Sequence, residues 1–123
     1  MTDASKYRKV MVTGGAGFIG SNFVRMAHQC HPEWQIVVLD ALTYAGNLEN
    51  LAGMEDRVEF VRGDIADSDA VEKAMAGCDA VVNFAAESHD DRSLVDGRPF
   101  VKTNVEGTLV LLETAKKLGV SRF

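Results

Sequence analysis

The residues with the clearest chemical role form a glycine-rich turn near the start of the chain. Residues 10–20 read VMVTGGAGFIG, which is an apolar strand, a turn and the start of an apolar helix. The first N–H groups of a helix lack partners inside the helix and carry partial positive charge, so such a turn can bind a pyrophosphate. Two spacings of a dinucleotide motif fit, one starting at Gly14 and one at Gly15. In both, Gly17 leaves room for phosphate oxygens and Gly20 lets the helix lie close to the strand.

An ordinary glycine loop is the alternative, and an acidic residue further along the chain argues against it. Residues 35–40 read QIVVLD, an apolar strand that ends on Asp40 at the expected interval of about 20 residues from the turn. We expect Asp40 to accept hydrogen bonds from the adenosine ribose. A 2′-phosphate would face this carboxylate, and Ala41 offers no compensating cation, so the sequence favours NAD over NADP. A strand-terminal Asp that only caps a turn is the remaining alternative.

The composition excludes several classes of partner. With 123 residues, 46% of them hydrophobic, the chain is expected to form one domain with its own core. Its net charge of -5 comes without basic clusters, which argues against nucleic acid or an anionic membrane. No apolar run approaches the roughly 18 residues of a membrane span, and the N-terminus lacks a signal-peptide core, so we expect a cytoplasmic protein. Neither Cys30 and Cys78 nor the three histidines have metal-ligand spacing, so we expect free thiols and no metal.

Strands and helices alternate along the sequence. The apolar patterns predict a strand before the glycine turn and further strands at 35–40, 58–61 and 79–86, with helices at 19–31, 68–75 and 99–118 and a helical turn at 47–51. Asp67 or Ser68 caps the second helix. This alternation favours a doubly wound, Rossmann-like α/β fold, whose parallel sheet has right-handed crossovers and the spatial strand order 3-2-1-4.

The last predicted helix is rich in apolar residues. Pro99 suits its first turn and Gly119 its end. The side chains expected to face the core recur at helical intervals: Val101, Val105, Thr108, Leu109, Leu112, Ala115 and Leu118. Val110 and Leu111 add apolar surface elsewhere, so the helix is expected to be buried on more than one side.

Several segments are narrower signals than the glycine turn. They are TGGAGFIG at 13–20, LTYAGNL at 42–48, GDI at 63–65, AAESHDDRS at 85–93 and TNVEGT at 103–108. Together they resemble the extended short-chain dehydrogenase/reductases and, within these, the dTDP-glucose 4,6-dehydratases, over residues 8–123. Two positions depart from the dehydratase pattern, Ala41 where Lys is common and Asp90 where Val is usual. These departures leave the exact sugar nucleotide open.

The resemblance implies a role for each part of the motif set. It places Gly14, Gly17, Phe18, Ile19 and Gly20 around the pyrophosphate, Asp40, Ala41, Leu42 and Thr43 around the adenosine ribose, Asp64 and Ile65 at the adenine, and Phe84, Ala85, Ala86, Ser88 and Thr103 beside the nicotinamide. Ser88 and His89 are implied to meet the sugar nucleotide. Each of three residues also has a purely structural alternative. His89 could lie in a solvated polar loop, Asp64 could serve only as an acidic residue in a turn, and Thr103 could simply occupy the first turns of the helix.

The groups that perform the chemistry in this family are absent. The family converts dTDP-glucose to dTDP-4-keto-6-deoxyglucose by transient oxidation at C4, elimination of water and return of hydride to C6. Its Tyr-x-x-x-Lys pair and Thr-Asp-Glu segment do not occur, since Tyr7 and Tyr44 are followed four residues later by Met11 and Leu48. We therefore expect an NAD-binding domain over residues 1–123 that is the amino-terminal part of a longer enzyme, has no catalytic residues and is inactive alone. A stand-alone NAD-binding module and an epimerase fragment are the alternatives.

Association with another chain is also expected. The outer edge of strand 79–86 would be unpaired if the chain stops before a fifth strand. In this superfamily the helix that matches 99–118 resembles one half of a helical dimer interface. The sequence therefore predicts a homodimer through this helix, or association with the missing carboxyl-terminal part.

Overall fold

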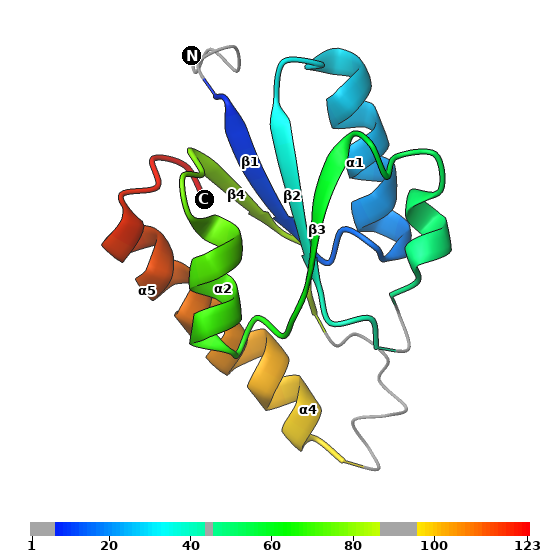
Figure 1. Cartoon of the computed structure of the whole chain (residues 1–123). Helices are drawn as coiled ribbons and strands as arrows, with labels where there is room; N and C mark the ends of the chain where they lie inside the picture. Colours follow the sequence, from blue (N-terminus) through cyan, green and yellow to red (C-terminus); the bar gives the residue numbers. More distant parts are fainter. Residues whose placement is uncertain (1–6, 44–45, 87–95) are drawn as a thin grey trace.

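The computed structural model describes residues 7–43, 46–86 and 96–123. In these residues four parallel strands form one sheet: β1 (Lys9–Thr13), β2 (Gln35–Asp40), β3 (Val58–Arg62) and β4 (Ala80–Asn83). Their spatial order is β3-β2-β1-β4, which confirms the predicted order and the Rossmann-like α/β class (Figure 1). Strand β1 is one of the two inner strands, and its Val10 lies opposite Ile36 of β2 and Ala80 of β4.

Helices cover both faces of the sheet (Figure 1). They are α1 (Phe18–Cys30), the 3-10 turn η2 (Leu48–Leu51), α2 (Ser68–Met75) and α5 (Thr108–Leu118). Val10 and Val12 pack on the side of α1 and η2, whereas Met11 and Leu39 pack on the side of α2 and α5. Burial on both faces explains why the inner strands β1 and β2 are mostly apolar, whereas the edge strand β3 carries the exposed Glu59 and Arg62. Among the described residues, no helix is long and apolar enough to cross a membrane.

The helix boundaries agree closely with the predicted ones. Asp67, not Ser68, caps α2, because its Oδ1 accepts the N–H of Asp69 at 3.1 Å. The last helix runs continuously through α4 (Arg98–Phe100), the π-helical segment η3 (Val101–Gly107) and α5 (Figure 1). It ends at Gly119, whose φ of 74° lies in the left-handed region that glycine adopts without strain.

The face that this last helix turns to the core differs from the predicted one. Leu111 is fully buried at 0% exposure, whereas Leu109 is 53% exposed and Val101, Val105 and Leu112 are exposed as well. Apart from Ala115, which is buried, and Thr108, which is half-buried, the predicted core stripe therefore points away from the sheet. The reason is close packing: the core-facing side carries the small residues Gly107, Thr114 and Ala115 around Leu111. Hydrophobic spacing alone does not weigh such small residues against large apolar ones.

Strand β4 is shorter than the predicted 79–86. Before the strand, Oδ2 of Asp79 accepts the N–H groups of Arg8 at 2.8 Å and Lys9 at 3.0 Å, and these bonds hold the pKa of Asp79 below its usual value. After it, Oδ1 of Asn83 accepts the N–H of Ala85 at 3.1 Å, which turns the chain away from the sheet. Side chains that bond the backbone compete with a strand in this way.

The outer edge of β4 is not wholly unpaired, which corrects the prediction made for it. Ala80 forms a parallel bridge with Arg122, and the N–H of Val81 donates to the Arg122 carbonyl at 2.9 Å. A cavity of about 410 Å³ lies beside this edge, and its walls include Phe23 and Trp34. The chain thus begins to cover the edge with its final residues.

Candidate dinucleotide site

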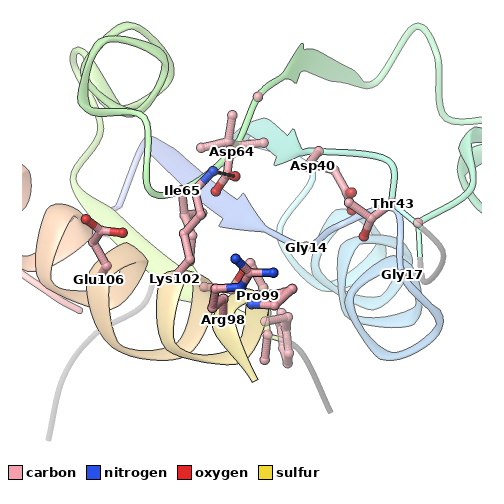
Figure 2. Close-up of a pocket in the computed structure, with 18 of the residues that line it drawn as sticks. Gly14, Gly17, Asp40, Thr43, Asp64, Ile65, Arg98, Pro99, Lys102 and Glu106 are labelled. Carbon is pink, nitrogen blue, oxygen red and sulfur yellow. Dashed lines mark ion pairs between the residues drawn. The ribbon is translucent and has the colours of Figure 1, made fainter. Parts of the chain in front are cut away.

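A cavity of about 510 Å³ opens at the carboxyl ends of the strands (Figure 2). Eleven of the predicted site residues line it, and they come from five segments: Gly14 and Gly17 after β1, Asp40, Ala41 and Thr43 after β2, Asp64 and Ile65 after β3, Phe84, Ala85 and Ala86 after β4, and Thr103 from η3. The parallel sheet brings these segments together because all four strands end at the same edge.

The glycine turn owes its shape to two close backbone contacts. Gly14 has a φ of 67°, and a Cβ there would lie 2.7 Å from the backbone nitrogen of Ala85. A Cβ at Gly20 would lie 2.1 Å from the Gly14 carbonyl oxygen. Both glycines are therefore required for packing, as predicted for Gly20, although Gly20 itself does not line the cavity.

Gly17 lies where the turn becomes a helix. It is the N-cap of α1, its φ of -76° and ψ of 175° are ordinary extended values, and its N–H donates to the Gly14 carbonyl at 3.1 Å. The next residues, Phe18 and Ile19, expose their side chains and do not line the cavity. Their N–H groups belong to the first turn of α1, where no acceptor exists inside the helix.

The carboxylate of Asp40 joins two loops. The residue is buried, and its Oδ2 accepts the N–H of Ala16 in the glycine turn at 3.0 Å while its Oδ1 accepts the N–H of Leu42 at 2.8 Å. Leu42 has a φ of 56° and does not line the cavity, so its part is to close the loop after β2. Asp40 thus caps a turn and also lines the cavity. Its carboxylate has about four acceptor positions, which leaves room for further donors.

Asp64 and Ile65 form the far end of the cavity, beyond β3. Oδ1 of Asp64 accepts the N–H of Ala66 at 2.9 Å, and its Oδ2 lies 3.3 Å from Nζ of Lys102. Ile65 is buried and packs against Gly107 of η3. This end therefore combines the apolar Ile65 with the ion pair of Asp64 and Lys102, which Figure 2 marks.

The sequence reasoning missed the polar side of the last helix. Arg98, Lys102 and Glu106 line the cavity at successive intervals of four residues, and Pro99 and Asp96 lie beside them. Arg98 is held by Asp96 through Nε–Oδ1 at 2.9 Å and Nη2–Oδ2 at 3.0 Å, contacts that lower the pKa of Asp96. The four-residue spacing next to Thr103 was the signal that could have revealed this wall.

Three further residues line the cavity. Leu39 and Gly63 directly precede Asp40 and Asp64, and the N–H of Gly46 donates to the Thr43 carbonyl at 3.0 Å. Two predicted contacts, Ser88 and His89, lie outside the residues that the structure describes. Within the described residues, no cluster of His, Cys, Asp and Glu side chains has the arrangement of a metal site.

The fold and the site together define a Rossmann-like dinucleotide-binding class. More narrowly, the chain belongs to the NAD dependent epimerase/dehydratase family, whose sequence profile matches residues 10–123.

Individual relatives place the chain near one branch of that family. It is 53% identical over 112 residues to a dTDP-glucose 4,6-dehydratase of Mycobacterium tuberculosis, a match that covers 91% of this chain and 34% of the relative. The crystal structure of the dTDP-glucose 4,6-dehydratase DesIV from Streptomyces venezuelae, which has NAD bound, is 48% identical, with a TM-score of 0.86 over 93% of this chain and 37% of that one. A Thermotoga maritima UDP-glucose 4-epimerase is 33% identical, with a TM-score of 0.82 over 91% and 35%.

The chain therefore spans about a third of the length of the curated relatives it matches.

Proposed function

We propose that this chain is the NAD-binding part of a sugar-nucleotide 4,6-dehydratase that acts on dTDP-glucose. The observation that carries the proposal is the cavity at the strand ends, which is lined by Gly14, Gly17 and Asp40. Ligands of doubly wound sheets bind at this edge. The 53% identity to a dehydratase, against 33% to an epimerase over the same share of the chain, favours the dehydratase.

Each part of NAD has a segment suited to it. The turn from Gly14 to Gly20, with the N–H groups of Phe18 and Ile19, would hold the pyrophosphate, Asp40 to Thr43 the adenosine ribose, Asp64 and Ile65 the adenine, and Phe84 to Ala86 with Thr103 the nicotinamide. Burial of Ile65 and the free acceptor positions of Asp40 support this assignment. When bound, NAD would supply reversible hydride transfer.

The chain by itself is proposed to bind and orient the cofactor without turning over the sugar. Its sequence lacks the Tyr-x-x-x-Lys pair that would take the proton from the C4 hydroxyl. Assay of the pure chain with dTDP-glucose should therefore yield no 4-keto-6-deoxy sugar, and formation of that product would contradict the proposal. The intact mass of the natural protein, compared with 13.4 kDa, separates a longer enzyme from a stand-alone module.

Asp40 is proposed to set the preference for NAD over NADP. Calorimetric titration should show NAD binding tighter than NADP, and Asp40→Ala should weaken NAD binding by about 1–3 kcal/mol, the range for a charged hydrogen-bond partner. Part of that loss would come from the glycine turn, since Asp40 also holds Ala16. Asp56→Ala, which removes an exposed carboxylate outside the cavity lining, is the control. Equal or tighter binding of NADP by the unaltered chain would overturn the assignment.

We also propose a homodimer through the last helix. The apolar side chains of Val101, Val105, Leu109 and Leu112 are exposed at helical intervals on the side away from the sheet. A continuous apolar stripe of this kind is typical of a helix that is covered by another chain or domain. Association with a carboxyl-terminal part of the enzyme is the alternative use of the same surface.

A further inference from the structure

We propose that Lys102 helps to decide which purine the Asp64 end of the cavity accepts, because it places an ammonium donor beside the Asp64 carboxylate. The inference rests on the proposed NAD site and extends it. Lys102 is not among the residues that the sequence motifs assign to that site. It lies on η3 and lines the same cavity.

The carboxylate of Asp64 is oriented by its own turn. Its Oδ1 accepts the N–H of Ala66 at 2.9 Å, which fixes the side chain and leaves Oδ2 facing Lys102. Nζ of Lys102 lies 3.3 Å from that Oδ2, and Figure 2 marks this ion pair across the end of the cavity. A ligand that reaches the cavity face of Asp64 therefore meets an acceptor and a donor side by side.

The separation between the two residues is set by packing. Gly107 brings η3 so close to the loop after β3 that a Cβ there would lie 2.4 Å from Cγ1 of Ile65. Ile65 follows Asp64 directly and is buried, so the backbone positions of both partners are fixed. The neighbouring cation Arg98 is held by two bonds to Asp96, which leaves Lys102 as the group that approaches Asp64.

The ion pair matters more for a bound ligand than for folding. The side chains of Lys102 and Asp64 are 58% and 37% exposed, and ion pairs this open contribute little to stability. A purine ring lying on Ile65 would exclude water from both charges and strengthen their interactions with its polar edge. The contribution of Lys102 should therefore appear in the choice of ligand.

The chemistry of the purine edge gives the direction of that choice. Adenine presents an amino group at C6, which donates to a carboxylate, whereas hypoxanthine presents a carbonyl oxygen at C6 and an N–H at N1. A carboxylate can accept the N1–H, but it repels the C6 oxygen, which needs a donor of its own. The Lys102 ammonium can donate to this oxygen. With Lys102 in place, the site should bind both rings, and without it the site should bind hypoxanthine more weakly relative to adenine by the equivalent of one charged hydrogen bond.

The test compares NAD with nicotinamide hypoxanthine dinucleotide by calorimetry. In the Lys102→Met variant, the ratio of the hypoxanthine Kd to the NAD Kd should rise by about tenfold over the unaltered chain, the size expected for loss of one charged hydrogen bond. Lys117→Met is the matched control, because it removes a lysine–carboxylate pair of 3.0 Å with Glu72 that lies outside the cavity lining. In Lys117→Met, the ratio of the hypoxanthine Kd to the NAD Kd should equal that of the unaltered chain.

A ratio that stays constant or falls in Lys102→Met would overturn the inference, and so would an equal rise in Lys117→Met. If the unaltered chain binds neither dinucleotide, the proposed function fails first and this inference fails with it. Binding of NAD with no change in the ratio contradicts the role of Lys102 alone. The two failures are thus distinguishable.

Discussion

Gly17→Val is expected to abolish NAD binding while the fold survives. The residue lines the cavity at the N-cap of α1, so an isopropyl group there would occupy the space next to the first N–H groups of the helix. Its φ of -76° and ψ of 175° are open to valine, and for this reason we expect little backbone strain. Calorimetry should show at least about a 100-fold loss of affinity, which is about 2.7 kcal/mol.

Gly97→Val is the matched control for this experiment. Gly97 is also a helix N-cap with negative φ, at the start of α4, and it does not line the cavity. The Gly97→Val variant should bind NAD with about the affinity of the unaltered chain. Unchanged NAD affinity in Gly17→Val, with a normal circular dichroism spectrum, would show that the glycine turn is not where the pyrophosphate binds.

The second large effect concerns the face of the last helix. Leu111→Ala should lower the free energy of unfolding by about 3 kcal/mol, because it leaves a cavity beside the sheet where the side chain is fully buried. Leu109→Ala removes the same atoms from a side chain that is 53% exposed and should cost less than about 1 kcal/mol. Urea unfolding of the two variants measures the difference. A larger loss of unfolding free energy in Leu109→Ala than in Leu111→Ala would show that the helix packs on the sheet through the face predicted from the sequence.

The same pair of variants tests the proposed dimer. Light scattering over a concentration series should show weaker self-association for Leu109→Ala, since this leucine belongs to the exposed apolar stripe. Leu111→Ala should change association less than it changes stability. A chain that stays monomeric at high concentration would contradict the proposed homodimer.

Sequence alone predicted the parts of this fold that depend on strong local patterns. The strand order followed from the alternation of apolar strands and helices. The turn at Gly14 to Gly20 followed from its glycines, and the structure shows that a Cβ at Gly14 or Gly20 would collide with backbone atoms. These patterns are local, and each has few alternatives.

The errors arose where tertiary packing decides between equivalent patterns. The last helix is apolar on two sides, and the side that faces the sheet is the one whose small residues, among them Gly107 against Ile65, allow close packing. The end of β4 depends on the Asn83 side chain, which competes with the strand for the backbone. Lys102 was missed because its partner Asp64 is 38 positions away, and no local motif joins them.

A crystal structure of this chain grown with NAD tests the central claim most directly. We expect the pyrophosphate at the turn of Gly14 and Gly17, the adenosine ribose at Asp40 and the adenine on Ile65 beside Asp64, all within the cavity at the carboxyl ends of the strands. A dinucleotide bound elsewhere on the molecule, or an empty cavity in crystals grown at saturating NAD, would contradict it.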